Sequence, residues 1–202
     1  MSMTYLCMDF GCGHARVRGD DDEHWLGVDA YPVAGVDVAA VWSRTQRALP
    51  FRDGVFNRVR LSHVLEHVVD PVDLLSECRR IVRRGGHVEV RVPHHTSIWA
   101  HEVNHRSYYN AFSLDVLFAD SDASAEGRAL FELGERTVVL RCPPDRGGRA
   151  PGFLVRRAER LVNRHVFFAE LHLLKLVGAY EIRFVLHPID VVSGDIVDTS
   201  RE

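Results

Sequence analysis

Glycines and carboxylates near the N-terminus form the first group of residues that could do chemistry. An apolar run over residues 4–10 contains Asp9 and leads into a turn with Gly11 and Gly13. Glycines at a strand-to-helix turn let the backbone approach a ligand closely. Asp29 ends the next apolar segment, where a carboxylate can accept hydrogen bonds from ribose hydroxyls. Together they predict a site for a ribose-containing cofactor, the alternative being a tight glycine turn followed by a capping aspartate.

A nicotinamide dinucleotide fits this segment less well. Arg16 stands where the Gly-x-Gly-x-x-Gly fingerprint needs its third glycine. A pyrophosphate also needs the N-terminus of a helix, and the short connection before the second strand leaves room only for a short helix.

Histidines form the second group. His63, Glu66 and His67 match the H-x-x-E-H pattern of some zinc proteases. That pattern requires both histidines on one face of a long helix, whereas here it directly follows a predicted strand. We therefore do not expect a zinc protease.

Four more histidines crowd one segment after the fifth predicted strand: His94, His95, His101 and His105. They could bind a divalent metal, which would make the protein a metal-assisted enzyme using the His94–His105 segment. We favour a polar substrate cleft, because α/β sheets bind ligands beyond the carboxyl ends of their strands. No metal ligand is assigned from the sequence.

The elements that would position these groups alternate between strands and helices. Strands are predicted over residues 4–10, 25–29, 36–40, 55–62, 87–92, 130–141 (with a bulge at Gly134) and 180–186. The clearest helix has Asp70 as its N-cap and Pro71 in its first turn, runs through Arg84 and stops at the following two glycines. Shorter helical signals cover 113–119, with Ser113 as N-cap, and 153–178, with a break near Asn163. The alternation indicates a mostly parallel α/β sheet.

Charged residues occupy alternate positions in three of these strands: Arg58 and Arg60, Glu89 and Arg91, Glu181 and Arg183. A strand sandwiched between helices should be apolar on both faces. We therefore expect one charged sheet face that is wet, or that is covered by the 153–178 helices or by a second subunit.

The ordered combination of segments resembles class I S-adenosylmethionine (SAM)-dependent methyltransferases, in particular a small bacterial methyltransferase type 11-like family. The family's first motif resembles DFGCGHARVRG, and the end of its second strand resembles GVD. Its later half resembles ALPFRDGVFNRVRLSHVLEHVVDPVDLLSECRRIVRRGGHVEVRVP. The segments HEVNHRSYYNAFSLDVLF and FFAELHLLKLVGAYEIRFVL are similar to the C-terminal parts of methyltransferases from polysaccharide gene clusters.

The resemblance implies an α/β, Rossmann-like class I methyltransferase fold. Its mostly parallel seven-stranded sheet would have an antiparallel last strand, and the usual N-terminal helix would be missing. A single domain is expected over residues 1–187, with a helical insertion at about 153–178 and a C-terminal tail over 188–202.

The resemblance also implies that SAM is the cofactor. The cofactor-binding residues would be Asp9, Gly11, Cys12 and Gly13 around the methionine part, Asp29 at the ribose, Ala40 near the adenine, and Ser62 and His63 near the sulfonium. Three positions depart from the family pattern: Ala15 replaces a third glycine, Val41 lies where an acidic residue often meets the adenine, and Asn57 replaces an aspartate. Each departure is expected to weaken SAM binding.

Methyl transfer to oxygen or nitrogen needs proximity, alignment and sometimes a general base. His67 or His105 is predicted as the base, with Glu66 orienting it, although a structural or substrate-binding role is an equal alternative for each histidine. The predicted function is methylation of a small polar acceptor, a sugar or natural-product hydroxyl by resemblance. The first rival is a non-catalytic or repurposed protein of the same fold.

The overall composition limits the kinds of binding partner that we expect. The net charge of −3 in 202 residues argues against a broad electrostatic grip on nucleic acid. No apolar stretch approaches the length of a membrane span, and the N-terminus lacks the basic start of a signal peptide. The four cysteines show no paired spacing, so we expect a reduced, cytoplasmic protein with a small-molecule substrate. A homodimer is compatible with these features.

Overall fold

The computed structural model describes residues 5–14, 16–17, 19–43, 45–118 and 129–189. Ala15 of the predicted cofactor motif and residues 190–202 of the predicted tail lie outside the described residues. No helix in these ranges is long and apolar enough to cross a membrane.

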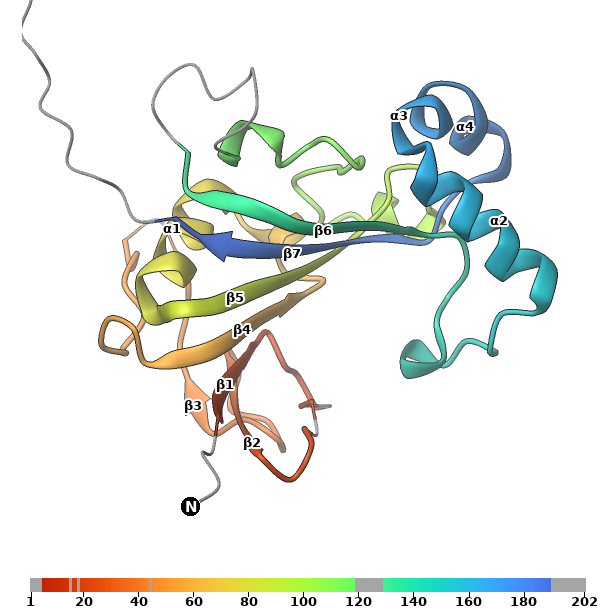
Figure 1. The fold of residues 1–202 in the computed structure, drawn as a ribbon. Coiled ribbons are helices and arrows are strands. Elements are labelled where there is room, and N and C mark those ends of the chain that lie inside the picture. The colour runs from red at the N-terminus through yellow and green to blue at the C-terminus, as the bar shows by residue number, and fades with distance from the viewer. Residues whose placement is uncertain (1–4, 15, 18, 44, 119–128, 190–202) are drawn as a thin grey trace, which may run out of the picture.

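Seven strands form one sheet in the order β3-β2-β1-β4-β5-β7-β6 (Figure 1). Their bounds are β1 Tyr5–Phe10, β2 Glu23–Asp29, β3 Val38–Ala39, β4 Phe56–Ser62, β5 Val82–Pro93, β6 Phe131–Val139 and β7 Glu181–Pro188. Strands β1 to β5 are parallel, and β7 runs antiparallel between β5 and β6. The predicted seven-stranded α/β sheet with an antiparallel last strand is confirmed.

The helices are few and short. The α-helices are α1 Pro71–Ile81, α2 Phe153–Arg164, α3 Val166–Phe168 and α4 Leu174–Val177, and a π-helical turn, Ala169–Leu173, joins the last two. Single 3₁₀ turns cover Leu65–His67 (η1), Ile98–His101 (η2), Asp115–Leu117 (η3) and Pro144–Arg146 (η5). Helices α2 to α4 gather beside one end of β6 and β7 (Figure 1).

Helix α1 begins where the sequence predicted, with Pro71 in the first turn after Asp70. The predicted end was wrong, because the helix stops at Ile81 and Val82 already starts β5. A Cβ on Gly86 would lie 2.5 Å from the Asn57 carbonyl oxygen. Residues 83–86 therefore form part of strand β5 and pass close to β4. Glycine is needed at position 86 for this close approach, and not to end the helix.

Two other predictions need correction. The described residues between β1 and β2 contain no helix. The helix predicted over 113–119 is a single 3₁₀ turn after Leu114, and the Ser113 hydroxyl accepts a hydrogen bond from Asn110 N instead of capping it.

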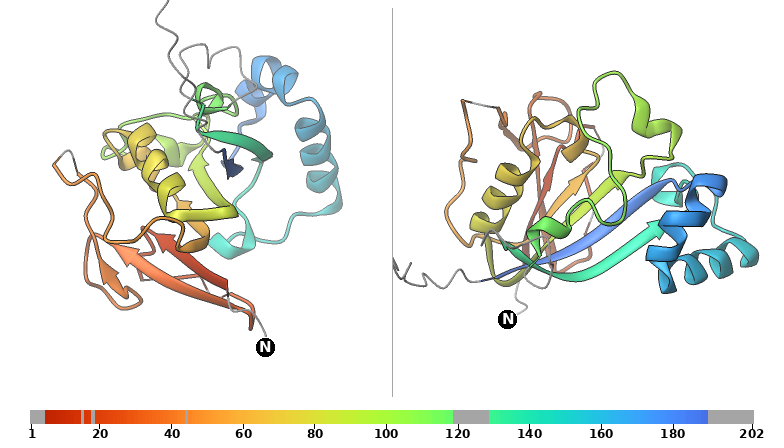
Figure 2. Two further views of the ribbon diagram at one scale, coloured as in Figure 1. Left: turned by 60° about the vertical axis from the view of Figure 1, so that its left-hand side comes forward. Right: turned by 90° about the horizontal axis from the view of Figure 1, so that it is seen from above.

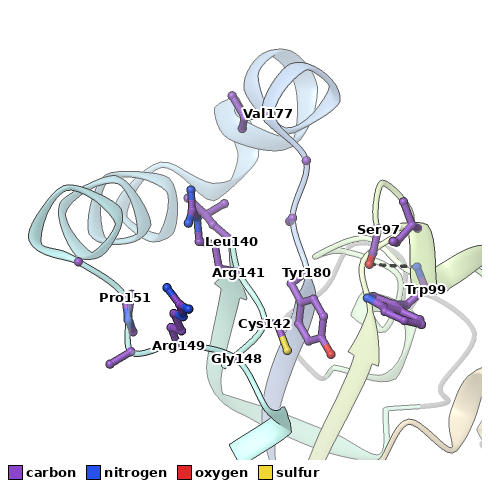
Figure 3. Close-up of a pocket in the computed structure, with 15 residues that line it drawn as sticks. Ser97, Trp99, Leu140, Arg141, Cys142, Gly148, Arg149, Pro151, Val177 and Tyr180 are labelled. Atoms are coloured by element: carbon purple, nitrogen blue, oxygen red, sulfur yellow. Dashed lines mark hydrogen bonds between the residues drawn. The ribbon is translucent and has the colours of Figure 1, made fainter. Parts of the chain in front are cut away.

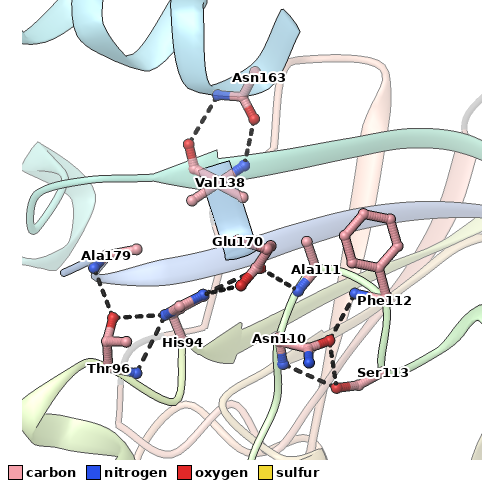
Figure 4. Close-up of polar contacts among 10 residues, drawn as sticks. All are labelled: His94, Thr96, Asn110, Ala111, Phe112, Ser113, Val138, Asn163, Glu170 and Ala179. Atoms are coloured by element: carbon pink, nitrogen blue, oxygen red, sulfur yellow. Dashed lines mark hydrogen bonds and ion pairs between the residues drawn. The ribbon is translucent and has the colours of Figure 1, made fainter. Parts of the chain in front are cut away.

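The break predicted near Asn163 in the 153–178 helix is confirmed, since α2 ends at Arg164 and His165 interrupts the helix. The Asn163 side chain itself bonds both Val138 N (2.6 Å) and Val138 O (2.9 Å) on β6 (Figure 4). The β6 bulge at Gly134 is confirmed by the register shift there.

The two faces of the sheet differ in character. One face carries Val88, Val90 and Val92, which are fully buried, and α1 packs its apolar side chains onto it (Figure 2). The register pairs Arg60 with Glu89 and Arg91 with Arg183. Residues paired in register lie on the same face.

All six charged residues therefore share the opposite face, as predicted. Arg58 binds Glu23 at 3.0 Å and Glu89 at 3.3 Å there. The side chains of Arg58, Glu89 and Arg183 are 24–32% exposed, so water reaches this face. Helices α2 to α4 cover only the end of β6 and β7 (Figure 2).

Glu77 on α1 anchors the segment that leads into β4. Its carboxylate accepts hydrogen bonds from Leu49 N at 2.6 Å and from Arg80 at 2.5 and 2.8 Å. Arg80 also donates to the Phe51 carbonyl. Burial alone would raise the pKa of Glu77, but the Arg80 and Leu49 hydrogen bonds outweigh it and lower the pKa.

The first prediction is that Glu77→Gln destabilises the fold by about 1.5–3 kcal/mol at pH 7, because charge-assisted hydrogen bonds are lost. A lowered pKa means that this contribution is complete above the unfolded carboxyl pKa, near ~4.3, and disappears as pH falls through the lower folded pKa. Denaturant unfolding from pH 7 to pH 3 measures the difference from wild type. The exposed Glu132→Gln is the control, expected within about 0.5 kcal/mol. A difference that is unchanged at pH 3 would contradict the assignment.

Candidate functional site

A 490 Å³ pocket lies beyond the carboxyl ends of β1, β2 and β4. Its volume is within the roughly 300–1,000 Å³ range of small-molecule sites. Strand order reverses between β1 and β4, which is where open α/β sheets bind ligands. Five of the predicted site residues line this pocket: Gly11, Asp29, Ala40, His63 and His67.

The turn after β1 depends on two glycines. Gly11 has φ +74°, and a Cβ there would lie 2.5 Å from Val64 Cγ2. The turn can therefore approach the segment after β4 only without a side chain. Gly13 has φ +51°, with no atom within 4 Å of its Cβ position, so it faces open space.

Asp29 ties this turn to the end of β2. Its Oδ2 accepts a hydrogen bond from Gly13 N at 2.9 Å, and its Oδ1 accepts one from Tyr31 N at 3.1 Å. Each carboxylate oxygen can accept two hydrogen bonds. The carboxylate on the pocket wall can therefore also accept hydrogen bonds from ligand hydroxyls.

Asp9 and Cys12 shape the turn from behind and do not line the pocket. Asp9 is 4% exposed and accepts a hydrogen bond from Val17 N at 3.0 Å. Burial raises its pKa, opposed by that hydrogen bond and by Arg60, Arg91 and Arg146. The Cys12 thiol lies against the carbonyls of Gly13 and Gly35, and burial raises its pKa to about 11. It is therefore a packed thiol rather than a thiolate.

Ser62 and His63 are neighbours at the end of β4, but only His63 lines the pocket. The Ser62 hydroxyl accepts a hydrogen bond from Arg146 at 2.6 Å and is not among the pocket-lining residues. His63 lines the pocket in a left-handed conformation, φ +58°, which a non-glycine residue adopts at an energetic cost and often at functional sites. Its Nε2 lies 3.2 Å from Glu181 and its Nδ1 lies 3.3 Å from Glu66. Burial alone would lower the pKa of His63, but hydrogen bonding to these carboxylates raises it.

The three predicted catalytic residues come together at the pocket edge. One possible ligand atom from each of Glu66, His67 and His105 lies within 4.8 Å of the others. The His67 and His105 rings are 4.6 Å apart between centroids and nearly perpendicular. Two hydrogen bonds hold the two segments together, Arg106 N to Glu66 O at 2.7 Å and Tyr109 hydroxyl to Leu65 O at 3.1 Å.

The other histidines of the 94–105 segment lie elsewhere. His94 is fully buried, with Nε2 3.2 Å from both Glu170 oxygens and Nδ1 2.7 Å from the Thr96 hydroxyl (Figure 4). Glu170 also accepts a hydrogen bond from Ala111 N at 2.7 Å. This network joins the segment to the π-helical turn and is structural. His101 is exposed, with Nε2 3.0 Å from the His95 carbonyl.

Several pocket residues were missed by sequence reasoning. The pocket is also lined by Tyr31, Trp42, Ser43, Arg47 and Arg106. Tyr31 and Trp42 lie just beyond β2 and β3, at the sheet edge where ligands bind, and this position was a usable signal. No sequence signal could have located Arg47 and Arg106, since long-range folding brings them here.

The departures from the family pattern have different consequences. Val41 lines the pocket, so the pocket wall has an apolar side chain where the family pattern often has a carboxylate. Asn57 lies outside it, and its Oδ1 accepts a hydrogen bond from Leu6 N at 3.1 Å. Asn57 therefore helps to join β4 to β1 and does not contact the pocket.

A second pocket of 480 Å³ lies between the end of β6, the loop leading to α2 and the segment after β5 (Figure 3). Trp99, Cys142, Arg149 and Tyr180 are among its lining residues. None of the predicted site residues lines it, so it is not the predicted site.

Comparison with known proteins agrees with this geometry. Residues 8–90 match a family model described as a methyltransferase domain. A SAM-dependent methyltransferase from Archaeoglobus fulgidus superposes with a TM-score of 0.54 at 15% identity, covering 92% of this chain and 86% of that one. A 16S rRNA (adenine(1408)-N(1))-methyltransferase mutant from Catenulisporales acidiphilia gives 0.54 at 14% identity, covering 94% and 90%. Geranyl diphosphate C-methyltransferase from Streptomyces coelicolor, solved with S-adenosyl-L-homocysteine, gives 0.53 at 12% identity, covering 93% and 74%.

A relative identified by sequence aligns with only a short part of this chain. It is an uncharacterised 37.1 kDa protein of a Streptomyces fradiae transposon, 42% identical over 45 residues. The match spans 22% of this chain and only 13% of that protein. The comparisons therefore confirm the fold, with a methyltransferase family model matched over residues 8–90, and leave the acceptor open.

The second prediction concerns Gly11. Gly11→Ala should destabilise the fold by about 2–4 kcal/mol, because a left-handed alanine and the overlap with Val64 both add cost. Gly13→Ala, with open space at its Cβ, should cost only the backbone term of about 1–2 kcal/mol.

Val64→Ala tests the cause. The double mutant Gly11→Ala/Val64→Ala lacks the overlap. Its loss of unfolding free energy should therefore be smaller than the sum of the two single-mutant losses by at least about 0.5 kcal/mol. Chemical denaturation of all four variants measures this coupling. Additive effects would refute the contact between the turn and Val64.

Proposed function

We propose that this chain is a class I SAM-dependent methyltransferase that transfers the SAM methyl group to a hydroxyl of a small polar acceptor such as a sugar or natural product. The observation that carries the proposal is the Asp29 carboxylate, which lines a 490 Å³ pocket beside the open turn at Gly13. The identity of the acceptor rests on the sequence resemblance.

The residues of the pocket fit SAM. When bound, SAM supplies a methyl group made electrophilic by its sulfonium. Asp29 would accept hydrogen bonds from the ribose hydroxyls, and Ala40, Val41 and Trp42 offer an apolar and aromatic wall for the adenine. Gly11 and Gly13 would let the backbone approach the methionine part.

Val41 sets the expected strength of binding. Family members often place a carboxylate here to accept a hydrogen bond from the adenine amino group. With Val41, adenine recognition depends on packing against Trp42 and Ala40. We therefore expect weaker SAM binding than in members with the acid.

Acceptor activation is assigned to the cluster of Glu66, His67 and His105. His67 lines the pocket, and the other two lie behind it. A hydroxyl becomes a good nucleophile when it loses its proton, and an adjacent cluster of histidines and a carboxylate can bring this about. The rRNA and geranyl diphosphate methyltransferases of similar fold support only the reaction class, because a fold does not determine the acceptor.

The third prediction is tested by calorimetric titration with SAM and with S-adenosylhomocysteine. Wild type is expected to bind both, and Asp29→Ala to weaken binding at least tenfold, which is about 1.4 kcal/mol. Asp29→Asn should weaken it less, because its amide oxygen still accepts one set of hydrogen bonds.

Asp21→Ala is the matched control. It removes an exposed carboxylate from the loop before β2, so it should bind as wild type does. Thermal melts show which variants remain folded. Failure of the folded wild type to bind either ligand would refute the proposal and favour a non-catalytic protein of this fold.

A further inference from the structure

Glu66 is a buried carboxylate without adequate compensation. Its side chain is 0% exposed, and in the described part of the chain Oε2 accepts no hydrogen bond, while Oε1 meets only the His63 ring. The nearest positive candidate is His63 Nδ1, 3.3 Å from Oε1. Burying a carboxylate is costly unless it is paired or bound to a metal. The site therefore calls for a further cation.

His105 is oriented as a metal ligand would be. Its Nδ1 lies 3.1 Å from the Ala100 carbonyl oxygen. A carbonyl only accepts, so Nδ1 carries the proton, which in the neutral ring leaves the lone pair on Nε2, 3.9 Å from the Glu102 carboxylate. Metal-binding histidines are commonly fixed by such a bond from their other ring nitrogen. The side chain is 4% exposed, which shields it from competing water.

The second histidine and carboxylate group of the protein provides the contrast. His94, His95 and Glu170 also bring ligand atoms within 4.8 Å of one another. There the carboxylate accepts hydrogen bonds from Ala111 N and pairs with His94. The carboxylate of that group is therefore satisfied by the protein itself, although His95 Nδ1 has no hydrogen-bond partner among the described residues, whereas the Glu66 carboxylate is not.

We infer that Glu66, His67 and His105 bind one divalent transition-metal cation at the edge of the cofactor pocket. Two imidazoles and one carboxylate suit zinc, iron(II) or manganese(II) and leave further coordination positions open. Ligand atoms at bond lengths of about 2.0–2.2 Å from a common centre require this cluster, whose ligand atoms lie within 4.8 Å of one another, to contract around the ion. His63 is not a ligand, because its left-handed backbone turns the ring between Glu66 and Glu181.

The role of the cation rests on the proposed function. A hydroxyl coordinated to a divalent cation loses its proton near neutral pH, as bound water does. The oxygen then forms a bond to the methyl carbon, the carbon–sulfur bond breaks, and its electron pair stays on sulfur. The hydroxyl proton goes to solvent, and the cation is neither oxidised nor reduced.

The experiment uses Co²⁺ and Zn²⁺ alone as probes, on protein freed of metal with a chelator. We expect one equivalent of Co²⁺ to give d–d absorption bands, and calorimetry to give one equivalent of Zn²⁺. Glu66→Gln, His67→Ala and His105→Ala should each weaken binding at least tenfold. His101→Ala is the matched control, an exposed histidine of the same segment, and should bind as wild type does.

Two outcomes would overturn the inference. One is the absence of saturable binding to folded wild type. The other is binding that survives in the folded His67→Ala variant together with folded Glu66→Gln, which would place the metal elsewhere. SAM titration with and without Zn²⁺ separates the two proposals. SAM binding without metal binding refutes only this inference, and metal binding without SAM binding refutes only the proposed function.

Discussion

Three aspartates hold the cofactor side of this protein in place of helices. Asp9 accepts a hydrogen bond from Val17 N at 3.0 Å, Asp29 from Gly13 N at 2.9 Å, and Asp37 from Gly27 N at 2.8 Å. A connection without helix must satisfy its backbone N–H groups elsewhere, and Asp9 and Asp29 do so for the turn after β1, while Asp37 ties Gly27 of β2 to the residue before β3. The Gly27 hydrogen bond and Arg16 lower the pKa of Asp37, so it acts as an anion. The shape of the pocket depends on this arrangement.

The charged face of the sheet is connected to the same site. Glu181 on β7 is fully buried beside Arg183, whose Nε lies 2.6 Å away, and beside His63 at 3.2 Å. Burial alone would raise the pKa of Glu181, but hydrogen bonds from His63 and Arg183 lower it. His63 in turn reaches Glu66. The ion pairs of the partly exposed sheet face thus continue through Glu181 to His63 at the pocket wall. There they orient the His63 ring.

The histidines of the segment after β5 divide it into two parts that are held by different contacts. His94 and Glu170 anchor the first part to the π-helical turn, with both ring nitrogens of His94 and both oxygens of Glu170 in polar contacts within the protein (Figure 4). His105 belongs to the second part, which Tyr109 and Arg106 fasten to η1. His105 thereby lies next to Glu66 and to the pocket-lining His67.

The sequence by itself determined the approximate positions of the strands, their mostly parallel arrangement, the start of α1 at Pro71 and the sharing of one face by the charged residues. These features follow from local periodicity and from residues adjacent along the chain. The tertiary structure decided the rest. The approach of Gly86 to the Asn57 carbonyl made residues 83–86 strand rather than helix, and distant aspartates removed the need for a helix after β1. Only folding brings His105 to Glu66 and His67 and leaves Ser62 outside the pocket, because these meetings depend on contacts between segments far apart in the chain, which local pattern does not encode.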